Sequence, residues 1–358
     1  MPRPTLACLL LALPLLVWAQ AKDAPIDFER ARTYLRKEQA GEPLTKDERD
    51  YLERAKAARA KGGAPDAGSR KAAGPSTGMV PLTELKAPYH GETGGLYGGG
   101  ANEPPAPLAQ AAAQAAAQIR PLDREGKPSA DGRIVVLSIG MSNTTQEFSA
   151  FQALSDEKRT RGRHVVLVDG AQGGQSADRI TDPEANFWKV VGQRLAQAQV
   201  TPAQVQAIWF KQAFPGPRAA FPADAKKLQG YVAQDLDVIR RNYANLRLIF
   251  FSSRIYAGYA TSSLNPEPHA YESAFAVRWT ILEQLEGGGP KSGRPTMIWG
   301  PYLWADGEKG RAKGDLVWKA EDFGPDGTHP SQSGRRKVAE QLETFFTTSP
   351  YAKDWYRQ

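Results

Sequence analysis

The chain has 358 residues, of which 41% are hydrophobic, so it is long enough for one large domain with appendages. Its formal net charge is +7 at pH 7, but the cationic residues are spread among acidic ones, which predicts a soluble protein with no nucleic-acid partner. A single cysteine, Cys8, and four histidines without metal-ligand spacing argue against disulfides, cysteine nucleophiles and metal sites.

The first 21 residues are typical of a signal peptide. Arg3 gives a positive start, Leu6–Val17 is an apolar run, and Ala19-Gln20-Ala21 has the small-x-small pattern that signal peptidase cleaves. The run is shorter than the ~18 apolar residues that suggest a membrane-spanning helix. We therefore expect a secreted or periplasmic protein that begins near Lys22 and has no transmembrane anchor.

Three segments precede the main domain. Residues 22–60 are predicted to form a charged helical hairpin, whose second helix begins at a capping box of Thr45 and Glu48. Its apolar stripe is thin, so we expect it to serve contact with the cell envelope or a partner. Residues 61–78 are rich in Gly, Pro, Ser and Ala, which is typical of a flexible linker. Residues 79–132 are expected to wrap the following domain as irregular chain with one short helix.

From Arg133 the pattern changes to short apolar runs that alternate with helical segments. Runs rich in Val, Ile and aromatic residues predict buried parallel strands. We therefore predict that residues 133–358 form a three-layer α/β/α domain of flavodoxin-like type with a five-stranded parallel sheet. The predicted strands are Ile134–Ile139, Val165–Val168, Ala207–Phe210, Leu246–Phe251 and Thr296–Trp299. The predicted helices are Trp188–Ala196, Ala223–Tyr243, Tyr271–Leu285 and Gly334–Phe346.

Candidate catalytic residues follow the first and the fifth strand. In such sheets the ligand site lies at the carboxyl ends of the strands. Ser142 stands in the turn Gly140-Met141-Ser142-Asn143, where it is either a nucleophile or a simple helix cap. Asp326 stands three residues before His329, so its carboxylate can hold the Nδ1 proton and leave Nε2 as a base. The alternative is a loop with an incidental histidine.

Two further turns offer hydrogen-bond donors for a developing oxyanion. The turn after the second strand, residues 169–174, contains glycines that let backbone N–H groups approach a ligand. After the third strand, Gln212 could donate from its side-chain amide, although Lys211 beside it is an equal candidate for facing the pocket. Each feature also has an ordinary structural explanation, as a simple turn or as a satisfied polar residue.

Side chains after the other strand ends are weaker candidates for binding substrate. Arg254 and Tyr256 follow the fourth strand, and Trp304 follows the fifth, where aromatic rings could form a platform for a sugar or pack in the core. Asn143, next to the candidate nucleophile, is a further candidate contact. Glu147 could pair with Arg254.

The ordered set of these blocks resembles the SGNH (GDSL-like) hydrolase superfamily over about residues 133–347. The G-x-S-N and Gly-Gly elements are most similar to the branch with sialate O-acetylesterases and acetylxylan esterases, although Met141 stands where that branch often has glutamine. The resemblance implies Ser142 as nucleophile and Asp326 with His329 as the activating pair. It also implies an oxyanion hole built from the N–H groups of Ser142 and Gly174 and the amide of Gln212.

The function that this resemblance implies is removal of a short acyl group, acetyl above all, from a carbohydrate or similar hydroxylated substrate. No cofactor is expected. A second hypothesis keeps the enzyme but gives it a lipid or aryl ester as substrate. A third hypothesis is an exported, non-catalytic protein that binds glycans or the envelope, but the retention of all three triad residues argues against it.

Overall fold

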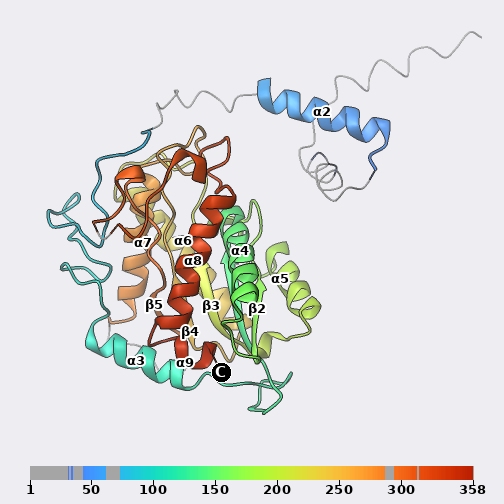
Figure 1. The fold of residues 1–358 in the computed structure, drawn as a ribbon, viewed down its shortest axis with the longest axis vertical. Helices are drawn as coiled ribbons and strands as arrows, with labels where there is room; N and C mark the ends of the chain where they lie inside the picture. The colour runs from blue at the N-terminus through green and yellow to red at the C-terminus, as the bar shows by residue number, and fades with distance from the viewer. Residues whose placement is uncertain are drawn as a thin grey trace, which may run out of the picture. The chain divides into compact units, whose positions relative to one another are not determined.

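A computed structural model describes residues 31, 34, 43–61, 73–286, 294–312 and 314–357. The chain divides into two compact units, Met1–Arg70 and Lys71–Gln358, which are drawn in Figure 1. The predicted signal peptide, residues 1–21, lies outside the described residues. None of the helices in the described part of the chain is long and apolar enough to cross a membrane.

The described helix of the first unit is α2 (Lys46–Lys61), which begins at the expected capping box. The N–H of Thr45 donates to Oε2 of Glu48 at 2.9 Å, and the N–H of Glu48 donates to Oγ1 of Thr45 at 3.3 Å. The rings of Tyr34 and Tyr51 meet edge to face with centroids 5.8 Å apart. Most of the first helix of the predicted hairpin lies outside the described residues.

The second unit contains a sheet of five parallel strands in the order β2-β1-β3-β4-β5, which confirms the predicted architecture. Each strand is short and mostly buried because helices cover both faces of a parallel sheet. The third strand is longer than predicted, and the fourth begins two residues later than predicted. The strands are β1 (Ile134–Gly140), β2 (Val165–Asp169), β3 (Val205–Lys211), β4 (Leu248–Phe251) and β5 (Thr296–Trp299).

Helices α4 and α8 pack side by side over one face of the sheet, and α6 packs on α7 over the other (Figure 1). Opposite faces follow from the right-handed crossovers, because α4 leads from β1 outward to β2 whereas α6 leads from β3 the other way to β4. The helices are α3 (Ala106–Ala117), α4 (Ser142–Lys158), α5 (Asn186–Gln197), α6 (Ala223–Asn242), α7 (His269–Glu283), α8 (Gln332–Thr348) and the short α9 (Lys353–Tyr356).

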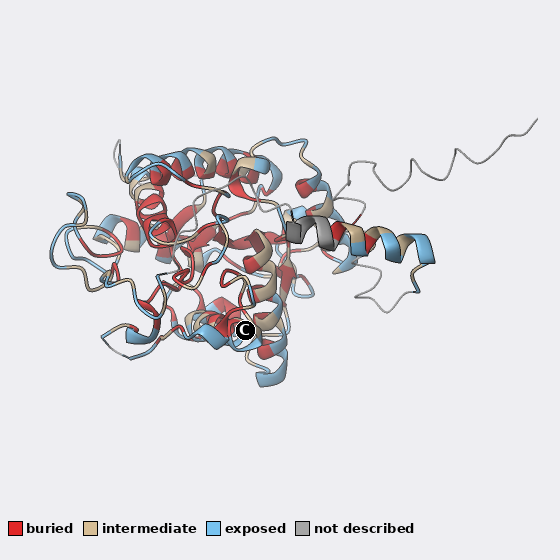
Figure 2. Cartoon of the chain, turned by 90° about the horizontal axis from the view of Figure 1, so that it is seen from above, coloured by how far each residue is buried: buried red, intermediate tan, exposed pale blue. Residues whose placement is uncertain are grey.

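The core of the second unit is the sheet itself. Every residue of β1 and of β3 is buried. Figure 2 shows buried segments in the interior and helices whose outer faces are exposed. Aromatic rings fill the space between the sheet and α8. The ring centroids of Phe250 on β4 and Phe346 on α8 are 5.7 Å apart, edge to face. The ring centroids of Phe346 and Tyr356 of α9 are 5.1 Å apart. The sheet is therefore packed against α8 and α9 by aromatic side chains.

The segment before β1 packs on the sheet domain by buried apolar side chains and by hydrogen bonds. Leu82, Leu96 and Leu108 are buried, and α3 is the short helix expected in this region. The bonds extend into the end of the expected linker, because residues 76–78 donate four hydrogen bonds to the buried carboxylate of Asp306, at 2.6–3.2 Å. Residues 73–78 therefore have fixed contacts with the domain, in contrast to the expectation of a flexible tether.

Candidate active site

Ser142 is the first residue of α4, directly after β1 and a short turn. Met141 occupies the N-cap position with extended backbone, so Ser142 does not cap the helix. The turn requires Gly140, because a Cβ there would lie 2.3 Å from Oγ1 of Thr144 and 2.4 Å from the carbonyl oxygen of Lys211. The Ser142 hydroxyl is therefore free for another partner, and its Oγ lies 2.8 Å from Nε2 of His329.

His329 and Asp326 lie in a tight hairpin between β5 and α8. Phe323 and Pro330 form an antiparallel bridge at its base, and the N–H of Gly324 donates to the carbonyl oxygen of His329 at 2.8 Å. Gly327 has a φ of +61°, and a Cβ there would lie 1.9 Å from the carbonyl oxygen of Tyr259, so the turn requires glycine. This turn brings the Asp326 carboxylate back to the imidazole, with Oδ2 2.5 Å from Nδ1.

The Asp326 carboxylate is held in its ionised form. Burial alone would raise its pKa, but hydrogen bonds from the backbone N–H and the imidazole of His329 outweigh burial, so the pKa lies below the ordinary value. Oδ1 accepts from the N–H groups of Thr328 and His329, each at 3.0 Å. Because Oδ2 is an acceptor for Nδ1–H, the Nε2 that faces Ser142 is left to take a proton.

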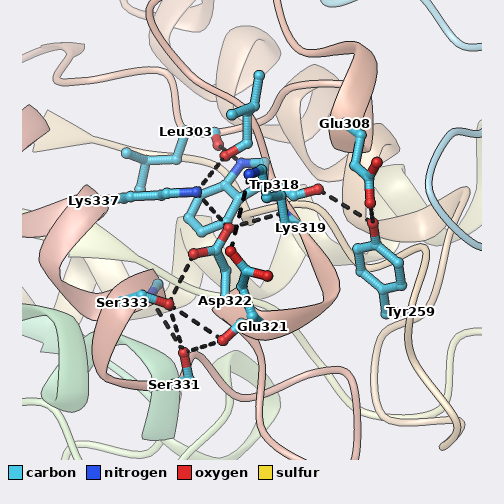
Figure 3. Close-up of polar contacts among 12 residues, drawn as sticks. Tyr259, Leu303, Glu308, Trp318, Lys319, Glu321, Asp322, Ser331, Ser333 and Lys337 are labelled. Atoms are coloured by element: carbon cyan, nitrogen blue, oxygen red, sulfur yellow. Dashed lines mark hydrogen bonds and ion pairs between the residues drawn. The ribbon is translucent and has the colours of Figure 1, made fainter.

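A buried anchor fixes this hairpin to the start of α8 (Figure 3). The carboxylate of Asp322 accepts from Oγ of Ser333 at 2.9 Å and from the N–H of Lys319 at 2.8 Å, and it forms an ion pair with Lys337. The N–H of Ser331 donates to the carbonyl oxygen of Asp322 at 2.9 Å. Hydrogen bonds of Asp322 and Ser331 thus fix the residues on both sides of the hairpin, which the D-x-x-H pattern alone did not indicate.

The glycine turn after β2 reaches Ser142. A Cβ on Gly173 would lie 4.0 Å from the Cβ of Ser142, whereas a Cβ on Gly174 would have no atom within 4 Å. Neither glycine N–H has a hydrogen-bond partner among the described residues, and both glycines are exposed. The N–H of Ser142 belongs to the first turn of α4, where backbone donors have no partner within the helix. The glycine turn thus lies near Ser142, and its two glycine N–H groups have no partner in the described part of the chain.

The expected oxyanion role of Gln212 does not agree with its contacts. Its Nε2 donates to the carbonyl oxygen of Gln175 at 3.1 Å, and its Oε1 accepts the N–H of Ala213 at 3.3 Å, so the amide supports the glycine turn instead. Lys211 does not face the pocket either. Its Nζ lies 2.7 and 2.5 Å from the two carboxylate oxygens of Glu147, in a buried ion pair. Glu147 therefore pairs with Lys211 and not, as the sequence had suggested, with Arg254.

This ion pair joins Glu147 of α4, the helix that begins at Ser142, to the end of β3. Burial lowers the pKa of Lys211 to about 8, because desolvation outweighs the attraction of Glu147. Thr144, in the first turn of α4, also donates to the carbonyl oxygen of Lys211 at 2.8 Å. Since Lys211 ends β3 and pairs with Gly140 of β1, these contacts fix the helix that begins with Ser142 to the sheet.

The four residues expected to bind substrate are all buried, and three of them donate side-chain hydrogen bonds within the protein. Asn143 donates from Nδ2 to the carbonyl oxygen of Thr328, Tyr256 donates from its hydroxyl to that of Gly74, and Trp304 donates from Nε1 to Glu267. Arg254 is 1% exposed, and burial lowers its pKa. The structure therefore gives no support to their role as substrate contacts or as an aromatic platform, because all four side chains are buried.

No group of three or more His, Cys, Asp or Glu side chains suited to a metal ion occurs in the described part of the chain. The arrangement at the sheet edge is instead a line of hydroxyl, imidazole and carboxylate. The side chains of His329 and Asp326 are 30% and 36% exposed. A substrate carbonyl can therefore reach Ser142 from solvent, in a site built by β1, the glycine turn after β2 and the hairpin before α8.

No protein-family model matches this chain, and no curated protein matches it. Among solved structures, the periplasmic domain of the lipopolysaccharide acetyltransferase of Salmonella ser. Paratyphi A is 13% identical, with a TM-score of 0.37 over 60% of this chain and 84% of that one. An α/β hydrolase from the metagenome of Lake Arreo, Spain, is 10% identical, with a TM-score of 0.35 over 62% and 96%. Likenesses this distant say nothing about chemistry, which has to be derived from the chain's own residues.

Proposed function

We propose that this chain is a secreted or periplasmic serine esterase of the SGNH type that removes a short acyl group, acetyl above all, from a carbohydrate or similar hydroxylated substrate. One observation carries the proposal: Oγ of Ser142 lies 2.8 Å from Nε2 of His329, whose Nδ1 lies 2.5 Å from Asp326. These are the distances and the order of contacts that a nucleophile, a base and an orienting carboxylate require.

The reaction follows from these contacts. His329 Nε2 takes the proton of the Ser142 hydroxyl as Oγ attacks the ester carbonyl carbon. The negative charge that develops on the carbonyl oxygen is stabilised by the unpaired N–H groups of the glycine turn and of Ser142. The imidazolium gives its proton to the departing alcohol, which leaves an acyl-serine. Water activated by His329 then attacks the acyl carbon and releases the acid, which restores the serine hydroxyl.

The preference for a short acyl group rests on the surroundings of the site. A lipid or aryl esterase needs an apolar groove, and the aromatic side chains expected to supply one, including Tyr256 and Trp304, are buried and bonded elsewhere. The same burial also removes the aromatic platform that was expected to contact a sugar ring. The exposed Gly173 and Gly174 leave an open approach that suits a small substituent on a large molecule.

The test compares acetyl, butyryl and octanoyl p-nitrophenyl esters with the wild-type protein, Ser142→Ala and the matched control Ser149→Ala. Ser149 lies on the same helix but away from His329, so its variant should keep wild-type kcat/KM. We expect hydrolysis to fall with acyl length, and Ser142→Ala to lose about 10⁴-fold or more in kcat. A fluorophosphonate should label Ser142 in the wild type. Turnover by folded Ser142→Ala at the wild-type rate would contradict the proposal.

A further inference from the structure

Exposed or half-exposed arginines stand at the amino end of every strand of the sheet. Arg133 directly precedes β1, Arg163 lies two residues before β2, Arg247 directly precedes β4 and Arg294 lies two residues before β5. The segment before β1 supplies two more at β3. We call this set the arginine edge: Arg120, Arg124, Arg133, Arg163, Arg247 and Arg294.

Backbone contacts show that these positions form one continuous edge. The carbonyl oxygen of His164, next to Arg163, accepts the N–H of Ile134, next to Arg133, at 2.8 Å. Arg247 bridges β3 and β5, because its N–H donates to Gln206 and its carbonyl oxygen accepts from Thr296.

The other two arginines join the same edge from the segment before β1. The N–H of Arg120 donates to the side chain of Gln206 at 3.2 Å, and Arg124 donates to the carbonyl oxygen of Gln199, just before β3, at 3.0 Å. Since parallel strands lie about 4.8 Å apart, the five-stranded edge is about 19 Å wide. It lies at the lower end of the sheet domain in Figure 1, where α9 ends.

The arginines of this edge outnumber the exposed carboxylates near it. None of the six arginines forms a salt bridge with a residue in the described part of the chain. Three neighbouring acids are already engaged: Asp156 with Arg161, Glu157 with Arg336, and Asp123 with backbone N–H groups of its own turn. The exposed acids near this edge are Glu125 and Asp131 of the hairpin before β1 and Asp354 of α9, fewer than the six arginines.

The sequence predicted scattered cations, because these six arginines are spread from residue 120 to residue 294. The fold gathers them, since parallel strands all begin at the same edge. The expectation of dispersed surface charge is therefore wrong for this face of the domain.

We propose that the arginine edge docks on a lipid surface that carries anionic phosphate headgroups. Guanidinium groups bind phosphate oxygens in pairs, and each basic residue near an anionic membrane adds to binding. The only large hydrophobic side chains that are exposed in the described residues are Val80 and Leu264, and neither lies on this edge. No large hydrophobic side chain is thus exposed there to stack on nucleic-acid bases or sugars, which favours headgroup phosphates over those partners.

Docking by this edge would direct the Ser142 site away from the lipid. Ser142 follows the carboxyl end of β1, and a strand of seven residues separates the two edges by about 23 Å. The ester would then be approached on the side facing away from the membrane, as on a polymer or a soluble molecule. This orientation, unlike the docking itself, rests on the proposed function.

The test measures co-sedimentation of the full chain with vesicles of phosphatidylglycerol and phosphatidylcholine, and with vesicles of phosphatidylcholine alone. The edge variant is Arg133→Gln/Arg247→Gln/Arg294→Gln, whose three side chains form no hydrogen bond in the described structure. The control variant, Lys86→Gln/Lys189→Gln/Lys309→Gln, removes the same charge from exposed positions elsewhere. Circular dichroism and the melting temperature verify that both variants fold, and the salt dependence of the wild type is a measurement that needs no variant.

We expect the wild type to bind only the anionic vesicles, and 0.5 M salt to release it, because the ions screen the headgroup charge. Each arginine should contribute about fivefold, so the edge variant should bind about a hundredfold more weakly, and the control variant within a few-fold of wild type. Equal binding by the two variants, salt-independent binding, or binding to duplex DNA but not to vesicles would overturn the proposal. Ser142→Ala should bind vesicles like wild type, so the outcome of the vesicle assay does not depend on whether the protein proves to be an esterase.

Discussion

The side-chain amide of Asn143 donates a 2.9 Å hydrogen bond to the carbonyl oxygen of Thr328, and both residues are buried. Asn143 directly follows Ser142, and Thr328 directly precedes His329. A single bond between residues 185 positions apart therefore sets helix α4 against the hairpin that carries His329. Asn143, expected as a substrate contact, is instead placed to fix the position of Ser142 relative to His329.

Replacement of Asn143 by alanine should slow catalysis more than it weakens substrate binding. Without the bond the hairpin can move relative to α4, and displacements of about 1 Å can cost about a hundredfold in rate. We expect kcat for an acetyl ester to fall ten- to a hundredfold with KM within about threefold of wild type. Steady-state kinetics and the melting temperature measure the two effects separately.

The matched control for this variant is Gln152→Ala. Gln152 lies on the same helix and also donates from its amide to a backbone carbonyl oxygen, that of Leu167, at 2.8 Å. It should show a similar loss of stability, of about 1–3 kcal/mol, with unchanged kcat. Equal losses of kcat in both variants would contradict a positioning role for Asn143.

Asp326→Asn should lower kcat by about 10⁴-fold, because an amide favours the wrong imidazole tautomer. The pKa of Asp326 is lowered in the folded state, so its carboxylate stabilises the fold above its unfolded pKa of about 3.9 and loses this effect as the pH falls through the folded pKa. Wild type should therefore melt higher than Asp326→Asn at pH 7, and the difference should shrink at pH 3. A difference in melting temperature that does not change with pH would contradict this assignment.

Because of Asp235 on α6, we expect a contribution to folding stability that changes with pH in the opposite direction. Its side chain is fully buried, neither carboxyl oxygen has a hydrogen-bond partner among the described residues, and burial, with the nearby Asp178, raises its pKa well above the ordinary value. Stability is then lost as the pH rises from about 4 towards the folded pKa, because the folded state holds the proton that the unfolded state releases.

Asp235→Asn removes this proton dependence, so its gain in melting temperature over wild type should be larger at pH 8 than at pH 5. Asp237→Asn is the control on the same helix, since Asp237 is exposed and pairs with Arg240 at 2.6 Å. That variant should change stability by less than about 1 kcal/mol at both pH values. A larger gain from Asp235→Asn at pH 5 than at pH 8 would rule out a buried, protonated carboxyl at this position.

Removal of the N-terminal unit should spare the site only if the contacts of residues 76–78 are kept. A protein that begins at Lys71 retains the hydrogen bonds to Asp306, so we expect the wild-type melting temperature and acetyl-ester hydrolysis. A protein that begins at Val80 leaves the buried Asp306 carboxylate without these donors, which should cost about 3–5 kcal/mol of stability. The two shortened proteins are compared by thermal unfolding and by activity per folded molecule.

A folded but inactive protein beginning at Lys71 would show that residues 22–70 contribute to the chemistry. Equal stability of the two shortened proteins would show instead that the bonds to Asp306 contribute little. The Asp306→Asn variant of the full chain, which keeps the segment but removes the charge, separates loss of these bonds from loss of the segment.

The features that the sequence predicted correctly depend on neighbours along the chain. The apolar runs of the five strands identified a parallel sheet, because burial on both faces leaves no polar side in a strand. Asp326 and His329 are three residues apart, so their contact needs only one tight turn. Ser142 needed more than its local turn, since its partner His329 lies 187 residues away. The common direction of the strands places both at the same edge of the sheet, but β3 and β4 lie between β1 and β5, so the packing of α4 on α8 is needed to bring the two side chains together.

Tertiary contacts decided what the sequence left open. Side chains of Lys211 and Gln212 point in different directions as β3 ends, but the presence of Glu147 in one direction and Gln175 in the other depends on which helix and turn pack there. The aromatic residues after β4 and β5 were ambiguous for the same reason, and the core buries them. Charge followed this rule most clearly: the sequence determined six scattered arginines, and only the common direction of the strands gathered them at one edge.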